Sequence, residues 1–457
     1  MLQIALWRRH AMTLALSLAG LAAAFACLPA AHTASAGPVT DLLVVDFPGL
    51  YYVGLILTAT AAVALLGYGY LSRLGGPCEE FYLLLVMAAL GAGVLVLSRH
   101  LAAFFIGLEI LSISLYALVA YPRHRVASVE AGLKYLVLAA VSSAFLLFGM
   151  ALIYTDAGTL DFAGLTSRLG AYQAAQTRPI LAAGAGMLLV GIGFKLALVP
   201  FHMWTPDVYQ GAPAPVTGFV ATVSKTAVIG LLVRLFAPDA LPGNLVLFKV
   251  FGVIALASMV GGNLLALMQL RVKRILAYSS IAHMGYLLTA FLAGGPLAVR
   301  AVTFYITAYT ITTLGAFGVV AVLSRKEGDA DALEDFQGLA RQNPWLGGIF
   351  AAMLFSLAGI PLTAGFVGKF YLVAAGVHSA LWWLVITLLL TSGISLFYYL
   401  RVIVVLFGPP DEARKLDPLR PAVGLSGGLV LGVLTVLLIW LGTGPGLLLA
   451  LIQGIAG

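Results

Sequence analysis

The stretch GIGFKLALVPFHMWTPDVYQGAPAPV, from Gly191 to Val216, places a lysine inside an otherwise apolar run. Lys195 lies directly between Phe194 and Leu196, and Pro200 follows five residues later. A charged side chain at the centre of a bilayer costs at least about 2.5–3.5 kcal/mol, and a proline interrupts a helix. Irregular backbone at membrane depth is tolerated only where it is buried in protein or lines a water-filled cavity. The stretch therefore predicts a broken transmembrane helix that holds a cation beside such a cavity.

The composition of the whole chain is that of a polytopic membrane protein. Of its 457 residues, 61% are hydrophobic and 9% are charged, whereas a soluble domain has roughly 25% charged residues. The two cysteines, Cys27 and Cys78, lie far apart and form no CxxC pair, which argues against an iron–sulfur cluster, a zinc site and a disulfide framework. The net charge of +7 is spread between hydrophobic runs, so it indicates orientation in a bilayer rather than nucleic-acid binding.

Apolar segments long enough to cross a bilayer recur along the chain. Since about 20 apolar residues span the hydrocarbon core, we expect an all-α fold with about 13 transmembrane helices. Their ranges are 11–31, 48–71, 80–98, 100–120, 127–154, 179–209, 213–236, 244–267, 273–293, 298–323, 342–376, 380–407 and 421–452. The segments at 179–209 and 342–376 are too long for one straight crossing, and each contains a proline, Pro200 and Pro361.

The basic residues predict the orientation of these helices. One set of alternate loops contains Arg8, Arg9, Arg73, Arg123, Arg125, Arg271, Lys273, Arg274, Arg325, Lys326, Arg341, Arg414, Lys415 and Arg420. The other set contains little beyond Arg99, Arg168, Arg178 and Arg300. Because cytoplasmic loops carry an excess of Lys and Arg, the first set is predicted to be cytoplasmic.

The first 36 residues allow two interpretations. WRRH, an apolar run and TASAG together are typical of a signal peptide cleaved after Ala36. The same apolar run also fits an ordinary transmembrane helix at 11–31.

Five charged residues are predicted at membrane depth. At 1.5 Å per residue, Lys134, Glu109 and Lys225 lie about 11, 14 and 18 Å into their helices. Lys195 and Lys369 lie within the two broken segments. Burial pushes a lysine toward neutrality and a nearby carboxylate reverses this, so a buried lysine that gains and loses such a partner is a proton switch. The alternative is a set of static Lys–Glu pairs that only fix helix packing. The other lysines are expected at helix ends or in loops where they reach water: Lys249, Lys273, Lys326 and Lys415.

The positions of the two breaks predict an internal repeat. Interrupted helices at corresponding positions of two halves mark the site of many transporters. We therefore expect N-terminal helices at 1–79, five-helix units at 80–236 and 244–407, and a C-terminal helix at 408–457. His202 and His283 are candidate proton relays because imidazole titrates near neutral pH, although a structural role fits each of them as well.

Four long motifs resemble one family. They are GFKLALVPFHMWTPDVYQGAPAPV, RILAYSSIAHMGYLL, SLAGIPLTAGFVGKFYL and LKYLVLAAVSSAFLLFGMAL. These stretches are similar to the antiporter-like membrane subunits of bacterial respiratory complex I, the NADH–quinone oxidoreductase, and most of all to its subunit N branch. The similarity extends from about residue 7 to the end of the chain.

The resemblance implies a fold, a set of residues and a set of partners. It implies two inverted five-helix repeats that form a proton channel in a redox-driven pump of the bacterial inner membrane. Carried over position by position, the family's charged residues are Glu109, Lys134, Lys195, Lys225 and Lys369, and His202 and His283 fall on its hydrated axis. Protons would pass from Lys195, held charged by Glu109, through Lys225 to Lys369. The chain itself would hold no cofactor or metal, while flavin, iron–sulfur clusters, NADH and quinone would bind other subunits.

One departure from the family concerns the N-terminus. The family has a further helix before the segment at 11–31, and MLQIALWRRH resembles the tail of that helix. The alignment of 11–31 with an ordinary family helix favours the transmembrane interpretation over the signal peptide.

Three other functions remain open from the sequence. The first is a subunit of a multisubunit Na+/H+ antiporter or of a membrane-bound hydrogenase, which resemble this chain as well. The second is a standalone secondary transporter. The third is a non-conducting scaffold whose lysines only hold helices together.

Overall fold

The computed structural model describes residues 4, 8–34, 37–165, 179–235, 245–409 and 424–456. These residues are almost entirely helical, apart from an antiparallel two-stranded ribbon of β1 (Gly37–Pro38) and β2 (Val44–Val45). The helices of the N-terminal half are α2 (His10–Ala26), α3 (Leu28–Ala34), α4 (Phe47–Leu74), α5 (Glu79–Leu97), α6 (Leu101–Val119), α7 (Val126–Ala157), α9 (Pro179–Leu196), α10 (Trp204–Gly211), α11 (Ala214–Phe219), the π-helical turn η1 (Val220–Ser224) and α12 (Lys225–Leu235). Those of the C-terminal half are α13 (Leu245–Leu267), α14 (Val272–Ala293), α15 (Gly295–Leu323), the 3₁₀ turn η2 (Leu333–Phe336), α16 (Leu339–Gln342), α17 (Pro344–Ala358), α18 (Ala364–His378), α19 (Trp382–Phe407), α20 (Leu425–Thr443) and α21 (Gly446–Ala456).

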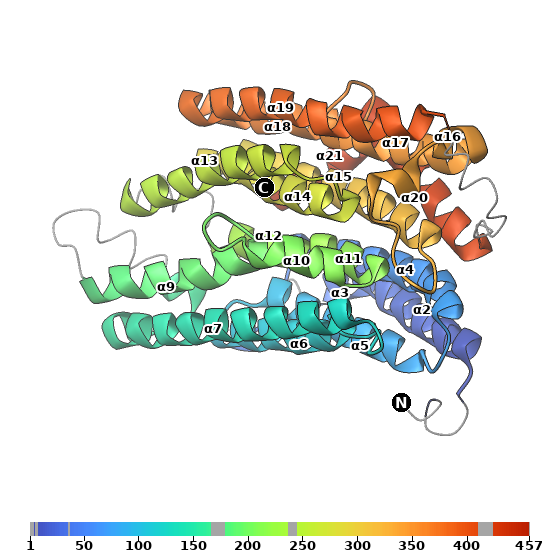
Figure 1. The fold of residues 1–457 in the computed structure, drawn as a ribbon. Coiled ribbons are helices and arrows are strands. Elements are labelled where there is room, and N and C mark those ends of the chain that lie inside the picture. The colour runs from blue at the N-terminus through green and yellow to red at the C-terminus, as the bar shows by residue number, and fades with distance from the viewer. Residues whose placement is uncertain are drawn as a thin grey trace.

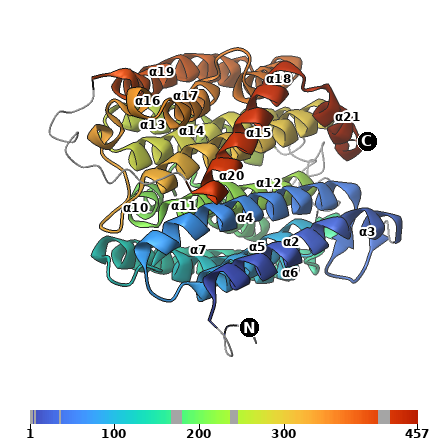
Figure 2. The ribbon, with the colours of Figure 1, turned by 90° about the vertical axis from the view of Figure 1, so that its right-hand side faces the viewer.

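The long helices lie side by side in two groups. Figure 1 shows α2 to α12, in blue to green, on one side and α13 to α19, in yellow to red, on the other. Figure 2 shows the same separation from the side, with α20 crossing in front of α15 toward α4. Because α20 packs on α4, α15, α17 and α18, it joins the two groups.

The predicted fold class is confirmed. Within the described residues, twelve helices are long and apolar enough to span a membrane, and they match twelve of the predicted ranges. The difference lies at 342–376, which forms two helices of 15 residues each, α17 and α18, instead of one long crossing. Several residues used for orientation, Arg168, Arg178, Arg414, Lys415 and Arg420, lie outside the described residues, as does Ala36, so the orientation stays a prediction.

Both predicted helix breaks are confirmed. The helix α9 ends at Leu196, and Ala197 turns the chain with a positive φ of 61° before α10 begins at Trp204. The helix α17 ends at Ala358, and Gly359 and Leu362 have φ values of 87° and 71° before α18 begins. Each break leaves carbonyl groups at a helix C-terminus without helical partners, which makes each break a place where a cation can bind.

The centre of the molecule is formed by α14 and α15. Nearly every residue of both helices is buried by protein. The two helices carry polar side chains along their length, including Ser280, His283, Tyr305 and Tyr309. Such groups cannot be satisfied by lipid, so the sequence of these helices places them inside the bundle, beside both breaks.

Candidate functional site

Lys195 lies in the last turn of α9, directly before the first break. Its side chain is buried, and its Nζ donates to Ser112 Oγ at 2.6 Å and to Tyr135 Oη at 3.4 Å. The ammonium also lies 5.3 Å from the centroid of the Tyr135 ring, within the range of a cation–π contact. The negative end of the helix dipole adds to these contacts. The site can therefore hold Lys195 protonated without a carboxylate in direct contact.

Glu109 and Lys134 do not pair with each other. Glu109, on α6, accepts a hydrogen bond from Ser143 Oγ at 2.5 Å, and the described residues contain no ion pair between Glu109 and a lysine. The expectation that Lys134 is buried is wrong, since its side chain is 44% exposed. Its Nζ instead contacts Glu130 at 2.8 Å and Asp207 at 2.9 Å. The prediction used the depth of Lys134 along α7, but the face of α7 that carries Lys134 lies at the surface of the chain.

Lys225 is completely enclosed by protein. It begins α12 directly after the π-helical turn η1, and π-helical turns often occur at functional sites. Its residue is fully buried, and the contact given for its Nζ is with Ser280 Oγ on α14 at 2.6 Å. Ser280 Oγ is in turn 2.5 Å from Tyr309 Oη on α15. A short chain of hydroxyl groups therefore leads from the Lys225 amine toward the second break.

Lys369 lies on α18 and binds the end of α17. Its Nζ donates to the backbone carbonyls of Leu357 and Ala358, each at 2.9 Å, and to Ser392 Oγ at 2.8 Å. These carbonyls belong to the last turn of α17, where helical partners are missing and the helix dipole is negative. The second break thus stabilises a buried ammonium with backbone dipoles and one hydroxyl group.

A small cavity borders both Tyr309 and Lys369. Its volume is about 10 Å³, close to the least that holds one water molecule. Its walls include Tyr309, His283, Tyr305, Ser356 and Lys369. A water molecule in this cavity would complete a route from Lys225 through Ser280 and Tyr309 to Lys369.

His283 borders this route and is held by two tyrosines. Its Nδ1 is 2.6 Å from Tyr305 Oη and its Nε2 is 3.3 Å from Tyr399 Oη. Tyr399 Oη also makes a short hydrogen bond with Ser279 Oγ. His202 is placed differently, in the unwound segment after α9, and its buried Nδ1 has no hydrogen-bond partner in the described part of the chain. The structure therefore brings His283, but not His202, into the cavity wall with Lys369.

Aromatic side chains separate Lys195 from Lys225. The Tyr135 ring stacks on Trp204 at a centroid distance of 4.9 Å, and Trp204 contacts Tyr209 at 6.3 Å. Tyr209 lies beside Ser280 and Tyr309, but its buried hydroxyl makes no hydrogen bond of normal geometry within the described residues. A series of aromatic contacts therefore leads from Tyr135, beside Lys195, to the neighbourhood of Ser280, the partner of Lys225.

The hydroxyl groups beside the lysines were not predicted from the sequence. Ser280 is three residues before His283, so helical spacing would have placed it on the same face. Tyr305 and Tyr309 are one turn apart in a membrane segment, which is the spacing of a polar stripe. Ser112 is three residues after Glu109. The signal in each case was a polar residue one turn from a charged or titratable residue.

The fold and the site together define a class of protein. They describe a multi-pass membrane protein of the antiporter type, in which buried lysines lie in and beside two broken helices. Among the described residues, no cluster of three or more His, Cys, Asp or Glu side chains could hold a metal ion.

Comparison with known proteins gives the family. The chain belongs to the NADH:quinone oxidoreductase/Mrp antiporter transmembrane family, whose pattern matches residues 98–395. It is 46% identical over 431 residues to NADH-quinone oxidoreductase subunit N of Methylococcus capsulatus, covering 93% of this chain and 86% of that protein.

Solved structures agree with this family. A chain of respiratory complex I from Thermus thermophilus with bound aureothin matches with a TM-score of 0.82 and 35% identity, covering 98% of this chain and 95% of that one. A chain of the Mrp complex from Dietzia sp. matches with a TM-score of 0.83, covering 100% and 94%. At 23% identity, this second match shows the fold alone.

Proposed function

We propose that this chain is a proton-translocating membrane-arm subunit of an NADH–quinone oxidoreductase, respiratory complex I, in a bacterial inner membrane. The observation that carries this proposal is the connection from Lys225 through Ser280 and Tyr309 to the cavity that Lys369 lines. Its relatives named subunit N support the assignment to the redox-driven complex. The alternative assignment, to an Na+/H+ antiporter or a hydrogenase, is not favoured.

The subunit's part in the reaction is the transfer of protons. Redox chemistry with flavin, iron–sulfur clusters, NADH and quinone is assigned to other subunits, and this chain supplies lysines and hydroxyl groups. When Lys225 loses its proton to the Ser280–Tyr309 chain, Lys369 gains one across the cavity. A charge change elsewhere in the membrane arm shifts the populations of the protonation states, because each lysine responds to the charge of its neighbour.

We assign the two halves of the channel to residues 80–236 and 244–407, with N-terminal helices at 1–79 and a C-terminal helix at 408–457. Within each unit the fourth helix is the broken one, α9–α10 in the first and α17–α18 in the second. Within each unit the second helix faces the lysine of that break: α6 supplies Ser112 to Lys195, and α14 supplies His283 to the cavity of Lys369. This correspondence supports an internal repeat of five helices whose two amino-acid sequences have diverged.

Purification of the intact assembly tests this function. A C-terminal tag on the chain, mild detergent and identification of the co-purifying proteins should recover flavin- and iron–sulfur-containing subunits with NADH–quinone activity. Recovery of antiporter-like membrane subunits alone, without NADH oxidation, would instead assign the chain to an ion exchanger without redox chemistry.

A further inference from the structure

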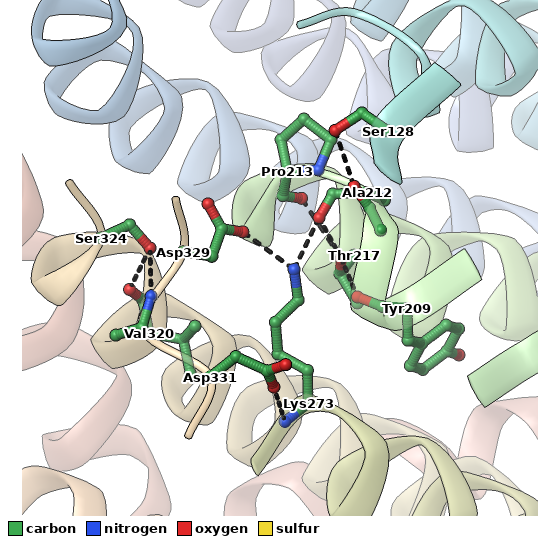
Figure 3. A network of polar contacts seen from close by, with 12 residues as sticks. Ser128, Tyr209, Ala212, Pro213, Thr217, Lys273, Val320, Ser324, Asp329 and Asp331 are labelled. Atoms are coloured by element: carbon green, nitrogen blue, oxygen red, sulfur yellow. Dashed lines mark hydrogen bonds and ion pairs between the residues drawn. The ribbon is translucent and has the colours of Figure 1, made fainter. Parts of the chain in front are cut away.

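A buried ion pair outside the lysine chain contacts the first broken helix. Lys273, at the start of α14, has a side chain that is only 1% exposed, and its partner Asp329 is 7% exposed. The expectation that Lys273 reaches water is therefore wrong. Its Nζ lies 2.8 Å from Asp329 Oδ2 and donates to the backbone carbonyl of Ala212 at 2.6 Å (Figure 3).

Asp329 collects donors from three parts of the fold. Its Oδ1 accepts from Tyr70 Oη on α4 at 2.7 Å and from Arg125 Nη1, before α7, at 3.1 Å. Nη2 of Arg125 donates to the carbonyls of Arg325 and Lys326, in the loop that carries Asp329. Burial raises the pKa of the Asp329 carboxyl, but Lys273 and the other donors outweigh it and hold the pKa below its ordinary value.

The neighbouring Asp331 binds the backbone at the start of α14. Its Oδ1 accepts from the backbone N–H of Lys273 at 2.9 Å, and its carbonyl accepts from the N–H of Val272 at 2.7 Å. The loop after α15 therefore binds both the backbone and the side chain of Lys273. This leaves the ammonium little freedom to move away from Ala212.

Ala212 is the residue at which α10 ends and the chain turns into α11. Its carbonyl lies at the negative end of the short helix, where a cation is favoured. Ser128 Oγ donates to the adjacent Gly211 carbonyl at 2.8 Å, which ties the same junction to α7. From this junction α11 and η1 lead directly to Lys225, and Tyr209 lies one turn before it. The position of the junction thus sets the positions of both side chains.

We propose that Lys273 and Asp329 are positioning residues for proton transfer, forming a latch that holds the α10–α11 junction so that Lys225 meets Ser280. A buried ion pair adds little net stability compared with apolar residues of similar volume, so stability alone does not explain why this pair is present. The contact of Lys273 with the broken helix explains it. This inference rests on the proposed function.

The test measures protons moved per NADH oxidised by the intact complex in inverted membrane vesicles. The variants are Asp329→Asn, Asp329→Glu and the double variant Lys273→Met with Asp329→Asn, which leaves neither of these two charges without the other. The control is Asp46→Asn, which breaks a two-bonded ion pair with Arg234 at 2.6 Å, away from the α10–α11 junction. Lys225→Met serves as the reference variant in which proton pumping is lost.

The latch predicts a lower ratio of protons to NADH in Asp329→Asn and in the double variant, recovery in Asp329→Glu, and a normal ratio in Asp46→Asn. If Asp329→Asn fails to assemble, the double variant decides. A normal ratio in the assembled double variant overturns the latch, as does an equal loss in Asp46→Asn. A normal ratio in Lys225→Met would instead overturn the proposed function, so the two failures are distinguishable.

Discussion

At the scale of single residues, the site stabilises buried ammonium groups without carboxylates in contact. Lys195 has a serine and a tyrosine, Lys225 has Ser280, and Lys369 has two carbonyls and a serine. Neutral hydrogen-bond acceptors and dipoles stabilise a cation less than a carboxylate does. A lysine held in this way can release its proton more readily than one in an ion pair, which is what a relay requires.

The hydroxyl of Tyr309 is predicted to carry protons between Lys225 and the cavity. Tyr309→Phe keeps the ring but removes the group that bonds Ser280 at 2.5 Å, so NADH-driven proton pumping should fall while the complex still assembles. Tyr154→Phe, at a side chain 56% exposed, is the matched control and should pump normally. Unchanged pumping in Tyr309→Phe would remove this tyrosine from the relay.

Glu109 is predicted to act on Lys195 through its charge rather than through contact. Glu109→Gln keeps an acceptor for Ser143 but removes the negative charge, so turnover of the assembled complex should fall. Native gels quantify the amount of complex, and NADH–quinone activity per complex gives the turnover. If the amount falls and the turnover per complex does not, Glu109 has only a packing role.

At the scale of elements, the helix ends at the two breaks stabilise the ammonium groups of Lys195 and Lys369, which in other proteins are often stabilised by carboxylates. Sequence reasoning located both breaks correctly, because a proline near a lysine in an apolar segment is compatible with few structures besides an interrupted helix buried in protein. It did not find the carbonyl partners of Lys369, since backbone groups leave no trace in the sequence. It also misplaced Lys134 and Lys273, because depth along a helix does not reveal which face is covered by protein.

The second break depends on Gly359, whose φ of 87° suits glycine. A Cβ there would lie 2.9 Å from Cδ of Lys369, so Gly359→Ala should displace the lysine as well as strain the turn. Gly158→Ala, with φ of 65° and open space around it, brings similar strain without a lysine contact. We expect Gly359→Ala to lose proton pumping and Gly158→Ala to retain it. Equal effects of the two would reduce the role of Gly359 to backbone stability.

The Asp329 loop also makes a prediction about stability and pH. Removing the carboxylate leaves Lys273 buried and without this partner, which costs about 3–5 kcal/mol, so Asp329→Asn should lower the temperature at which the subunit aggregates. A carboxyl with a lowered folded pKa contributes its stability above the ordinary pKa and loses it as pH falls through the folded value. The difference in aggregation temperature between wild type and Asp329→Asn should therefore be the same at pH 6 and at pH 8. A difference that disappears at pH 6 would contradict the ion pair.

At the scale of the whole molecule, composition and hydrophobic runs were sufficient for the all-α membrane fold, because lipid permits few other solutions. The lysines at the two breaks and at the start of α12 followed from the energetic cost of burying charge. The connections between them did not follow, since Ser280, Tyr309 and the cavity come from three elements that meet only after folding. The repeat boundaries and the roles of the site residues stay predictions.

The most direct measurement compares Lys225→Met with Lys249→Met in the intact complex. Both changes remove an ammonium, but Lys225 is fully buried beside Ser280 and Lys249 is exposed on α13. NADH oxidation and proton uptake by inverted vesicles are recorded together for each variant. We expect an assembled complex with proton pumping lost or strongly reduced in Lys225→Met and normal in Lys249→Met. Normal pumping in Lys225→Met would show that protons do not pass through this lysine.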